Sequence, residues 1–325
     1  MNSVAGVATV PSAVYVDAFR EHERFLWGVS YRLTGSAADA DDLVQETFVH
    51  AIERPPARTD EPWRPWLVRV AMNLGRDLLR RRRRRTYVGP WLPSPIDTGE
   101  EESPPAYEPV VDGQTTEGRY DLLESVSFAF LLALEALTPQ QRAVLLLRDV
   151  FDYSVREAAD ALDMSEPNVK TTHHRARAAM RDYDRNRCVP THTLQERTRA
   201  ALGQFMASMA SGDVSAIESL LVDSVRAVND GAGEYHAARK VIVGPTRVAR
   251  FHYNIGSRRL AGARFCTRMI NGLPALVGEF TDHRPGEPPR VVMQCEVGPD
   301  GRITQLLSIV ASHKLTAIDF TFEQL

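Results

Sequence analysis

The feature that most constrains the fold of this chain is an acidic stretch near its middle. Residues 97–124 contain nine acidic residues and only one basic residue, Arg119. The same stretch contains Pro104, Pro105 and Pro109. A segment of this kind has too few apolar side chains to build a packed core, so we expect a solvated, poorly ordered linker. The 325 residues should therefore fold as more than one domain.

Basic segments flank the acidic stretch on both sides. Residues 58–85 carry ten arginines against three acidic residues and end in the run Arg80–Arg85, while residues 166–187 carry six basic residues against three acidic ones. A charge run is more often a solvated helix face than a binding site. The pattern alone therefore does not establish a polyanionic partner.

The composition is that of a globular protein, with 43% hydrophobic and 25% charged residues. Its longest apolar stretches fall far short of the roughly 18 residues that span a bilayer, and no basic residue precedes the mildly apolar N-terminus as in a secretory signal. We expect a cytoplasmic protein with no membrane contact. Cys188, Cys266 and Cys295 lack metal-ligand or redox spacing, which favours reduced thiols, with no metal and no cofactor.

A first helix is predicted from Ser36 to about Arg54. The segment Ser36–Asp39 resembles a capping box after the break at Thr34–Gly35. Helical spacing gives a core stripe of Leu43, Val44, Thr47, Phe48 and Ala51 and a second, acidic face of Asp39, Asp42 and Glu46.

A second helix follows Pro55–Pro56, with Pro65 in its first turn. The predicted inward side chains are Trp66, Leu67, Val70, Ala71, Leu74 and Leu78, and the opposite surface holds Arg69, Asn73, Arg76, Asp77 and Arg80. Arginines can neutralise phosphates, and Asn73 and Asp77 can pair with the base edges of opened DNA. Packing is favoured over base stacking for Trp66, and the two are nearly even for Trp63.

A helix-turn-helix is predicted after the linker. Thr138–Gln141 and Ser154–Glu157 are capping boxes, Asp163–Ser165 is a short turn, and Ser165 caps the next helix. Its predicted inner face is Val169, His173, Ala176 and Met180, and its outer face includes Asn168, Thr171, His174, Arg175 and Ala178. We expect base contacts from Asn168, Thr171 and Arg175 and phosphate contacts from Lys170, Arg177 and Arg181. Packing is favoured over metal binding for His173.

From Thr193 onward, helical patterns through about Val222 give way to strands. Asn271–Gly272 between residues 264–270 and 273–281 is a strong type I′ hairpin signal, and Pro299–Gly301 separates residues 291–297 from 303–312. We expect an α+β unit with a curved antiparallel sheet and an apolar pocket beneath its helices. Asp230, His236 and His252 could form an acid/base set, but no spacing compels it. A catalytically silent regulatory domain is favoured over a retained small-molecule site.

Three segments, residues 32–48, 65–73 and 137–142, together resemble bacterial extracytoplasmic-function sigma factors of the sigma-70 family. The resemblance implies a helix that docks on the clamp helices of the largest subunit of RNA polymerase core, with contacts from Asp39, Asp42, Gln45 and Glu46. It also implies capture of the opened minus-ten strand near Asn73, Arg76, Asp77 and Arg80, and recognition of the minus-thirty-five promoter element by residues 166–177, including Glu166 and His174.

The linker sequence Trp91–Leu92–Pro93 resembles that of sigma factors that carry a SnoaL-like C-terminal domain, a cone-shaped barrel, in place of a separate anti-sigma protein. Two further motifs of that group appear in altered form, as Asp230–Glu234 and Ala311–Leu315. The resemblance implies regulatory contacts between domains from Trp91, Leu92, Pro93, Asp230, Gly231, Gly233, Glu234, Lys314 and Leu315.

The expected domains are two all-helical sigma domains at 15–86 and 125–187, an acidic flexible linker at 87–124 that contains the Trp91–Leu92–Pro93 motif, and the α+β domain at 193–325. The favoured function is a sigma factor that recruits polymerase to promoters and assists their opening, with no enzymatic activity, and with an unknown small-molecule ligand as an option for the C-terminal pocket. Two alternatives stay open: an enzyme with a helical targeting module, and a helix-turn-helix regulator that binds DNA without polymerase. The acidic face of Asp39, Asp42 and Glu46 favours the sigma factor over the simple regulator, which has no need of it.

Overall fold

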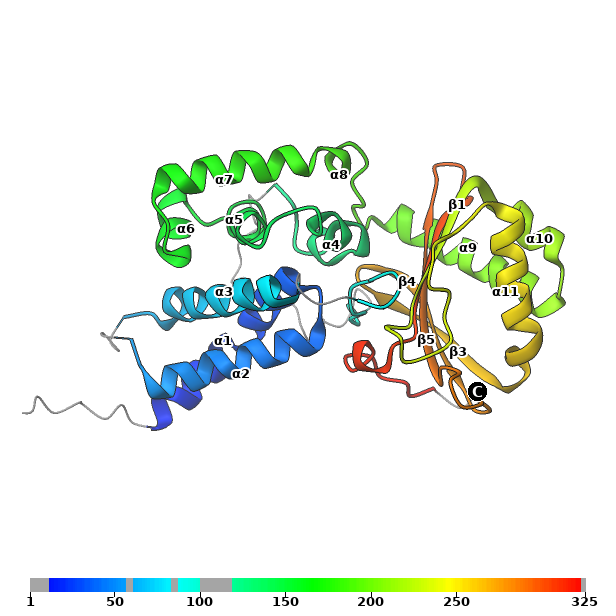
Figure 1. Ribbon diagram of the computed structural model, residues 1–325, viewed down its shortest axis with the longest axis horizontal. Helices are drawn as coiled ribbons and strands as arrows, with labels where there is room; N and C mark the ends of the chain where they lie inside the picture. The colour runs from blue at the N-terminus through cyan, green and yellow to red at the C-terminus, as the bar shows by residue number, and fades with distance from the viewer. Residues whose placement is uncertain (1–11, 57–60, 83–86, 100–118, 323–325) are drawn as a thin grey trace, which may run out of the picture.

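The computed structural model describes residues 12–56, 61–82, 87–99 and 119–322. Figure 1 shows two helical modules side by side and an α+β domain at their end. The chain crosses from the first module to the second by way of the α+β domain, because the segment before the acidic stretch lies against the sheet.

The first module consists of α1 (Ser12–Thr34), α2 (Ala37–Glu53) and α3 (Trp63–Arg82). The predicted start of α2 is confirmed, since the Ser36 hydroxyl accepts a hydrogen bond of 3.3 Å from the Asp39 amide. The predicted core stripe of α2 is buried throughout. Trp63 is also buried and packs edge-on against Tyr15, which assigns it a packing role.

The inward face of α3 differs from the prediction. Leu67 and Ala71 are buried as expected, but Trp66, Val70, Leu74 and Leu78 are only partly buried, and the core is completed instead by Val68, Met72, Gly75 and Leu79. The cause is Gly75, where a Cβ atom would lie 2.4 Å from a methyl carbon of Leu33. Because α1 packs directly on this glycine, α3 is rotated from the orientation that its bulky residues alone suggest.

The second module begins with a 3-10 turn, η1 (Glu124–Val126), and α4 (Phe128–Leu134), and continues with α5 (Pro139–Asp149), α6 (Val155–Leu162), α7 (Glu166–Ala179) and α8 (Arg181–Arg185). Both predicted capping boxes are present. Ser165 occupies the predicted cap position of α7, but its side chain makes no capping hydrogen bond. In α7, Val169, Ala176 and Met180 are buried as predicted, and Thr172 is buried where His173 was expected.

The two helical modules share one hydrophobic core. Two buried arginines also join them. Arg32 of α1 donates to the Ser125 hydroxyl (2.7 Å) and to the Leu122 carbonyl (2.9 Å). Arg142 of α5 donates to the Leu33 carbonyl at 3.0 Å. Each module thus inserts a charged side chain into the other and satisfies the backbone there.

The α+β domain holds three helices on one face of a six-stranded sheet (Figure 1). The helices are α9 (His192–Ser211), α10 (Val214–Ser219) and α11 (Pro245–Arg259), with 3-10 turns η2 (Leu260–Gly262) and η3 (Ser312–Lys314). The strands are β1 (Leu221–Asp230), β2 (Ile242–Val243), β3 (Ala263–Ile270), β4 (Leu273–Phe280), β5 (Arg290–Val297) and β6 (Ile303–Ile309), in the order β2-β1-β6-β5-β4-β3.

The predicted fold class, two all-helical modules followed by an α+β domain, is confirmed, and the sheet is mixed. The type I′ turn between β3 and β4 is present, with φ of 51° at Asn271 and 81° at Gly272. One strand pair differs from the expected antiparallel pattern, because β1 and β6 pair in parallel. Parallel neighbours need a long crossover connection, and the chain between β1 and β6 supplies it through α11 and the four strands β2, β3, β4 and β5.

Candidate functional site

An exposed stripe runs along α2 on the side away from its core. Asp42, Gln45 and Glu46 of the predicted polymerase-binding set lie on it, and all three are exposed. Two aliphatic residues that the sequence analysis missed continue the stripe at helical spacing, Val49 (50% exposed) and Ile52 (61% exposed). An acidic strip extended by exposed aliphatic side chains is suited to docking on another protein.

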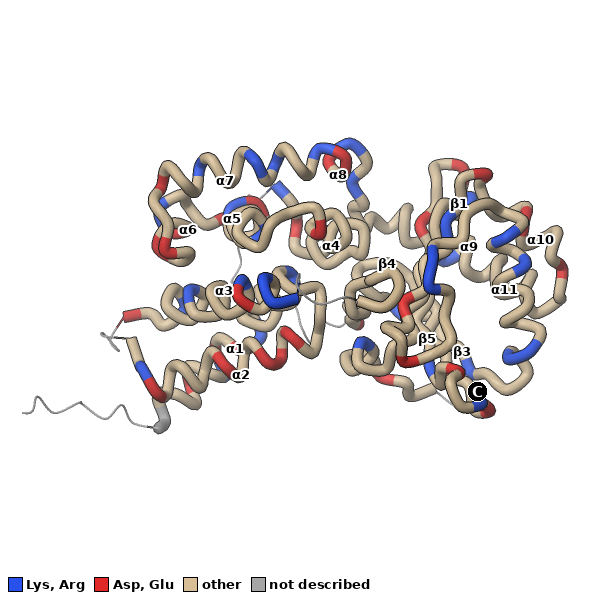
Figure 2. Tube along the Cα trace, viewed as in Figure 1, with Lys and Arg blue, Asp and Glu red and all other residues tan. Residues whose placement is uncertain are grey.

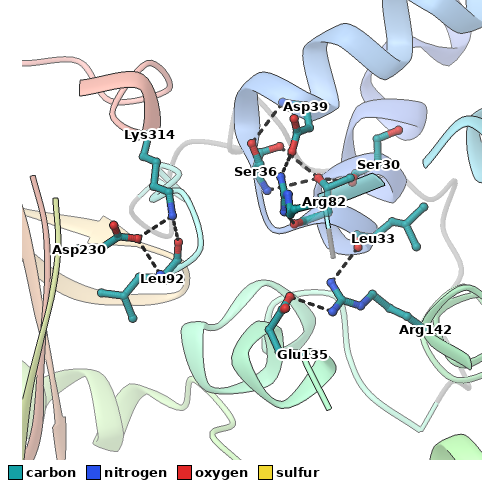
Figure 3. Close-up of polar contacts among 11 residues, drawn as sticks. Ser30, Leu33, Ser36, Asp39, Arg82, Leu92, Glu135, Arg142, Asp230 and Lys314 are labelled. Atoms are coloured by element: carbon teal, nitrogen blue, oxygen red, sulfur yellow. Dashed lines mark hydrogen bonds and ion pairs between the residues drawn. The ribbon is translucent and has the colours of Figure 1, made fainter. Parts of the chain in front are cut away.

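Asp39 does not belong to this open surface. It is partly buried and forms an ion pair with Arg82 at the end of α3, and Arg82 also donates to the Thr34 carbonyl at 2.9 Å (Figure 3). Asp39 therefore ties the start of α2 to the end of α3. The rest of the arginine run, Arg83–Arg85, lies outside the described residues.

The predicted nucleic-acid face of α3 lies opposite the helix-turn-helix. Together the two modules line a polar cleft of about 500 Å³. From α3 its lining comprises Asn73, Arg76, Asp77 and Arg80, and from the second module Gln140, Leu162, Asp163, Met164 and Asn168. Figure 2 shows α3, with charged positions along its length, beside the second module. Arg69 lies in a neighbouring cleft beside Phe151 and Tyr153.

The polar and charged side chains of α3 in this cleft pair with one another. Arg76 donates to the Asn73 side chain, and Arg80 lies 3.0 Å from the Asp77 carboxylate. Burial is the main cause that lowers the pKa of Arg76, and its Nε atom is buried without a hydrogen-bond partner among the described residues. In this arrangement Asn73 and Arg76 are partly buried in the cleft, whereas Asp77 and Arg80 stay exposed at its edge.

The predicted promoter-reading residues of α7 are exposed: Glu166, Asn168, Lys170, Thr171, His174, Arg175 and Arg177. Arg177 differs from the others because it holds the buried Asp149 carboxylate with two hydrogen bonds of 3.0 and 2.6 Å. Asp149 also lies 2.9 Å from His173 Nε2, which explains the partly buried position of that histidine. Arg177 thus fastens α7 to α5 in this state, whereas Arg175 is turned outward.

The start of the predicted flexible linker is ordered and buried, which corrects the expectation for residues 91–98. Leu92 is 1% exposed, Ser94 1% and Ile96 3%. Trp91 packs against Gly35 in the α1–α2 turn so closely that a Cβ there would lie 2.7 Å from its ring, and the Ser94 amide donates to the Gly35 carbonyl at 2.9 Å. Residues 91–96 are apolar or uncharged and belong to the same predicted linker as the acidic stretch, so its composition gave no sign that they would be buried. Residues 100–118 of that stretch lie outside the described residues.

A buried carboxylate joins the linker to the sheet (Figure 3). Asp230, at the end of β1, accepts hydrogen bonds from the Leu92 amide (2.8 Å), the Tyr87 hydroxyl (2.7 Å) and the Lys314 ammonium (2.6 Å). Lys314 also donates to the Leu92 carbonyl at 2.6 Å. Burial lowers the pKa of Lys314 to about 8, against the opposing effect of Asp230. We call Tyr87, Leu92, Asp230 and Lys314 the Asp230 cluster.

The two C-terminal motifs of the sequence analysis meet beside this cluster. Glu234 accepts from the Ser312 amide at 2.8 Å and pairs with His313. Gly233, with φ of 80°, lies against Val88 of the linker, and Leu315 is buried in the core that contains Leu92. The acidic residue at position 234 therefore has a complementary partner in the second motif.

Comparisons with known proteins agree with this architecture. A family model for sigma-70 region 2 matches residues 18–85, and one for sigma-70 region 4 matches residues 127–180. The ECF RNA polymerase sigma factor SigJ of Mycobacterium tuberculosis is 31% identical over 314 residues, which cover 92% of each chain. The chain belongs to the extracytoplasmic-function (ECF) RNA polymerase sigma factors. SigG of the same species is 30% identical over 78% of this chain and 70% of its own.

The likeness of this sigma factor to a solved structure also extends through the C-terminal domain. The crystal structure of M. tuberculosis SigJ matches with a TM-score of 0.67 and 27% identity over 94% of this chain and all of that chain. As a member of this family, the chain directs RNA polymerase to promoters. No helix among the described residues is long and apolar enough to cross a membrane.

The sigma factor has a central residue that the sequence analysis used only as a turn former. Asn271 is fully buried, and its side-chain amide donates to the Tyr31 hydroxyl (2.7 Å) and the Val126 carbonyl (2.6 Å) and accepts from the Ile96 amide (2.9 Å). One hairpin side chain thus binds the first module, the second module and the linker. A turn motif with Asn at φ above zero gives no sign of such contacts.

The three residues considered for acid/base chemistry do not form one site. His236 and His252 line a cavity on the helical side of the sheet, and Asp230 belongs to the cluster on the other side. Burial raises the pKa of Cys188 and Cys295 to about 12, which disfavours their reactive thiolate forms. Within the part of the chain that the structure describes, no cluster of side chains is suited to hold a metal ion.

Proposed function

We propose that this sigma factor regulates itself through its C-terminal domain, which keeps the linker and both promoter-binding modules in a closed arrangement. The observation that carries the proposal is the Asp230 cluster, where a buried carboxylate and ammonium group hold the linker backbone at Leu92. The domain takes the place of a separate anti-sigma protein. It acts without catalysis, and the protein works in the cytoplasm where its polymerase is.

The stripe of α2 is the proposed docking surface for the clamp helices of the largest polymerase subunit. Asp42, Gln45 and Glu46 supply charge and hydrogen bonds, and Val49 and Ile52 supply apolar contact. Asp39 contributes indirectly, because its pair with Arg82 holds the first turn of the helix. The stripe is open in the closed arrangement, which allows polymerase to bind before the modules separate.

The proposed promoter contacts divide between the two helical domains. Residues 15–86 form the domain that binds core polymerase and the minus-ten strand, through Arg69, Asn73, Arg76, Asp77 and Arg80. Residues 125–187 form the domain that reads the minus-thirty-five element, with base contacts from Asn168, Thr171 and Arg175. Glu166, Lys170, His174 and Arg177 contact or orient the backbone. Residues 87–124 connect these domains, and residues 193–325 form the regulatory domain.

The closed arrangement lowers promoter binding for a steric reason. Asn73 and Arg76 of α3 line the same cleft as Asn168 and are partly buried there, so an opened DNA strand reaches them in full only after the second module moves away. The linker that joins the modules is held at Leu92 by the Asp230 cluster and at Ile96 by Asn271. Release of these contacts lets the two modules separate and opens the α3 side of the cleft. A small molecule in the cavity of the C-terminal domain provides one means of control.

The test uses Lys314→Met, which leaves the Asp230 carboxylate buried without its cation and thereby weakens the hold on the linker. Lys240→Met is the matched control, because Lys240 is an exposed residue of the same domain. We expect Lys314→Met to increase binding of a single-stranded minus-ten DNA and promoter-dependent transcription with core polymerase, and Lys240→Met to behave as the unchanged protein. Equal activity of all three proteins, with Lys314→Met folded, would remove the regulatory role of the cluster.

A further inference from the structure

The outer face of α11 carries a row of arginines. Arg247, Arg250 and Arg258 are all exposed, and the exposed Asn254 lies between them. At about 3.6 residues per turn, the three arginines fall within about 80° of one another around the helix axis and span about 16 Å along it. We call these four residues the α11 stripe.

The stripe lies on an open side of the C-terminal domain. Helix α11 packs on α9, α10, β1 and β2 through its other face, where Val248, Ala249, His252 and Gly256 are buried. Figure 1 shows α11 on the side of the sheet away from the helical modules. The helix contains four arginines and no acidic residue, and Figure 2 shows basic positions near both of its ends. Positive charge is therefore gathered on one exposed helix face.

Local helix stability does not account for these charges. Arg247 lies in the first turn, where the helix dipole favours acidic side chains and opposes basic ones. Arg247 and Arg250 are three positions apart and repel each other, and α11 has no acidic residue to offset this repulsion. Only Arg258, in the last turn, is favourably placed. Two of the three arginines thus cost the helix a little stability.

The stripe also lacks the ion pairs that hold other arginines of the same domain. Arg264 and Arg290 both pair with Glu279. Among the described residues, none of the three stripe arginines forms an ion pair or a side-chain hydrogen bond. Glu218 of the neighbouring α10 accepts a hydrogen bond from the Thr246 hydroxyl instead. The guanidinium groups of the stripe are therefore available to a partner.

The chemistry of the stripe indicates which kind of partner it fits. No large apolar side chain of α11, a helix described in full, is exposed, whereas a membrane-bound helix or the centre of a protein interface needs such side chains. Phe251 and Tyr253 are partly buried, so the face offers no aromatic platform for single-stranded bases. Arginines alone suit the phosphates of duplex DNA, and at about 3.4 Å per base pair the stripe covers about five base pairs.

We propose that the α11 stripe is a second DNA-binding surface, which holds the phosphate backbone of the promoter duplex through Arg247, Arg250 and Arg258 without reading its sequence. This role goes beyond the regulation proposed above, because the stripe is open while the linker is held. Figure 1 shows α11 at the end of the molecule opposite α6, so the contact engages duplex outside the element that the helix-turn-helix reads.

The first test measures binding of the full chain to a long fluorescent duplex without promoter elements, by anisotropy at several salt concentrations. The triple variant Arg247→Gln/Arg250→Gln/Arg258→Gln removes three phosphate contacts. We therefore expect the slope of the logarithm of affinity against the logarithm of salt concentration to become shallower by about 2 to 3. Affinity at low salt should fall about tenfold or more.

The matched control removes the same charge from scattered positions of the same domain. The variant Arg197→Gln/Arg199→Gln/Arg284→Gln changes three exposed arginines outside α11, and its slope should change by less than about 1. Both sets of arginines are exposed, so both variants should fold as the unchanged protein does. An unchanged slope for the α11 variant, or equal changes for the two variants, would overturn the proposal.

The second test locates the contact in the complex of polymerase, sigma factor and promoter. A benzophenone photocrosslinker on Asn254→Cys, in a chain whose native cysteines are replaced by alanine, should crosslink to the promoter duplex, and the same label on the exposed Thr193→Cys should not. Crosslinks from position 254 to polymerase alone would assign the stripe to a protein partner and reject the DNA contact. Neither test alters the Asp230 cluster, so failure here leaves the regulatory proposal as it stands.

Discussion

At the scale of single residues, Asn271 has two structural roles: its backbone forms a tight turn, and its side chain joins three parts of the molecule. Its backbone adopts φ of 51° in the β3–β4 turn, a conformation that Asn and Gly tolerate better than other residues. Its side chain forms three buried hydrogen bonds to Tyr31, Ile96 and Val126. Only the turn can be predicted from the sequence, because the hydrogen-bond partners of the side chain lie up to 240 positions away along the chain.

Asn271→Gly separates these roles, because glycine keeps the turn and removes the three hydrogen bonds. We expect the free energy of unfolding in urea to fall by about 2 to 4 kcal/mol, as several buried groups lose their partners together. Asp300→Gly, in the exposed β5–β6 turn, is the control and should change stability far less. Equal losses for the two variants would show that Asn271 matters only as a turn residue.

His252 gives the C-terminal domain a pH-dependent stability. Its folded pKa of about 4 lies below the value of 6.5 expected in the unfolded chain, so the unfolded state binds the proton first as the pH falls. The contribution is fully present above pH 6.5 and is lost progressively down to pH 4. By pH 5 it amounts to a loss of about 2 kcal/mol. Thermal unfolding at pH 7 and pH 5 should show this loss in the unchanged protein but not in His252→Leu, and parallel losses in both would contradict it.

At the scale of elements, α2 shows how a helix serves a core and a partner at once. Its buried stripe packs on α1 and α3, and its exposed stripe combines Asp42, Gln45 and Glu46 with Val49 and Ile52. Exposed aliphatic residues next to acidic ones cost stability little and leave contact area for a partner.

Glu46→Lys should weaken binding to purified polymerase core by about tenfold or more, because it places a like charge where the proposed interface needs an acidic group. The stability of the chain should stay within about 0.5 kcal/mol, as for most exposed substitutions. Glu23→Lys on α1, also exposed, makes the same change of charge and should leave binding unaltered. If both variants bind core as the unchanged protein does, α2 is not the docking surface.

Elements with strong local signals were predictable, and long-range contacts were not. Capping boxes at Thr138 and Ser154 and the turn at Asn271–Gly272 act within a few residues, so the sequence locates them accurately. The orientation of α3 depends on Gly75 against Leu33, and the burial of Leu92 depends on Asp230 and Lys314. Those partners lie far along the chain, so periodicity carries no information about them.

At the scale of the whole molecule, the two faces of the sheet have different neighbours. One face of the sheet packs on the helices and borders the cavity, and the other packs on Leu92, Phe128 and the C-terminal residues Leu315, Ile318 and Phe320. The two helical modules meet in front of this second face (Figure 1). Contacts at the sheet therefore bear on the spacing of both promoter-binding modules.

The most direct test of the closed arrangement is the distance between the two helical modules in solution. Spin labels at Arg81→Cys in α3 and Arg181→Cys in α8, in a chain whose native cysteines are replaced by alanine, report it by double electron–electron resonance. We expect one short, narrow distance distribution for the free protein and a longer, broader one for Lys314→Met, with Lys240→Met unchanged. A broad distribution in the free protein, or identical distributions in all three, would contradict it.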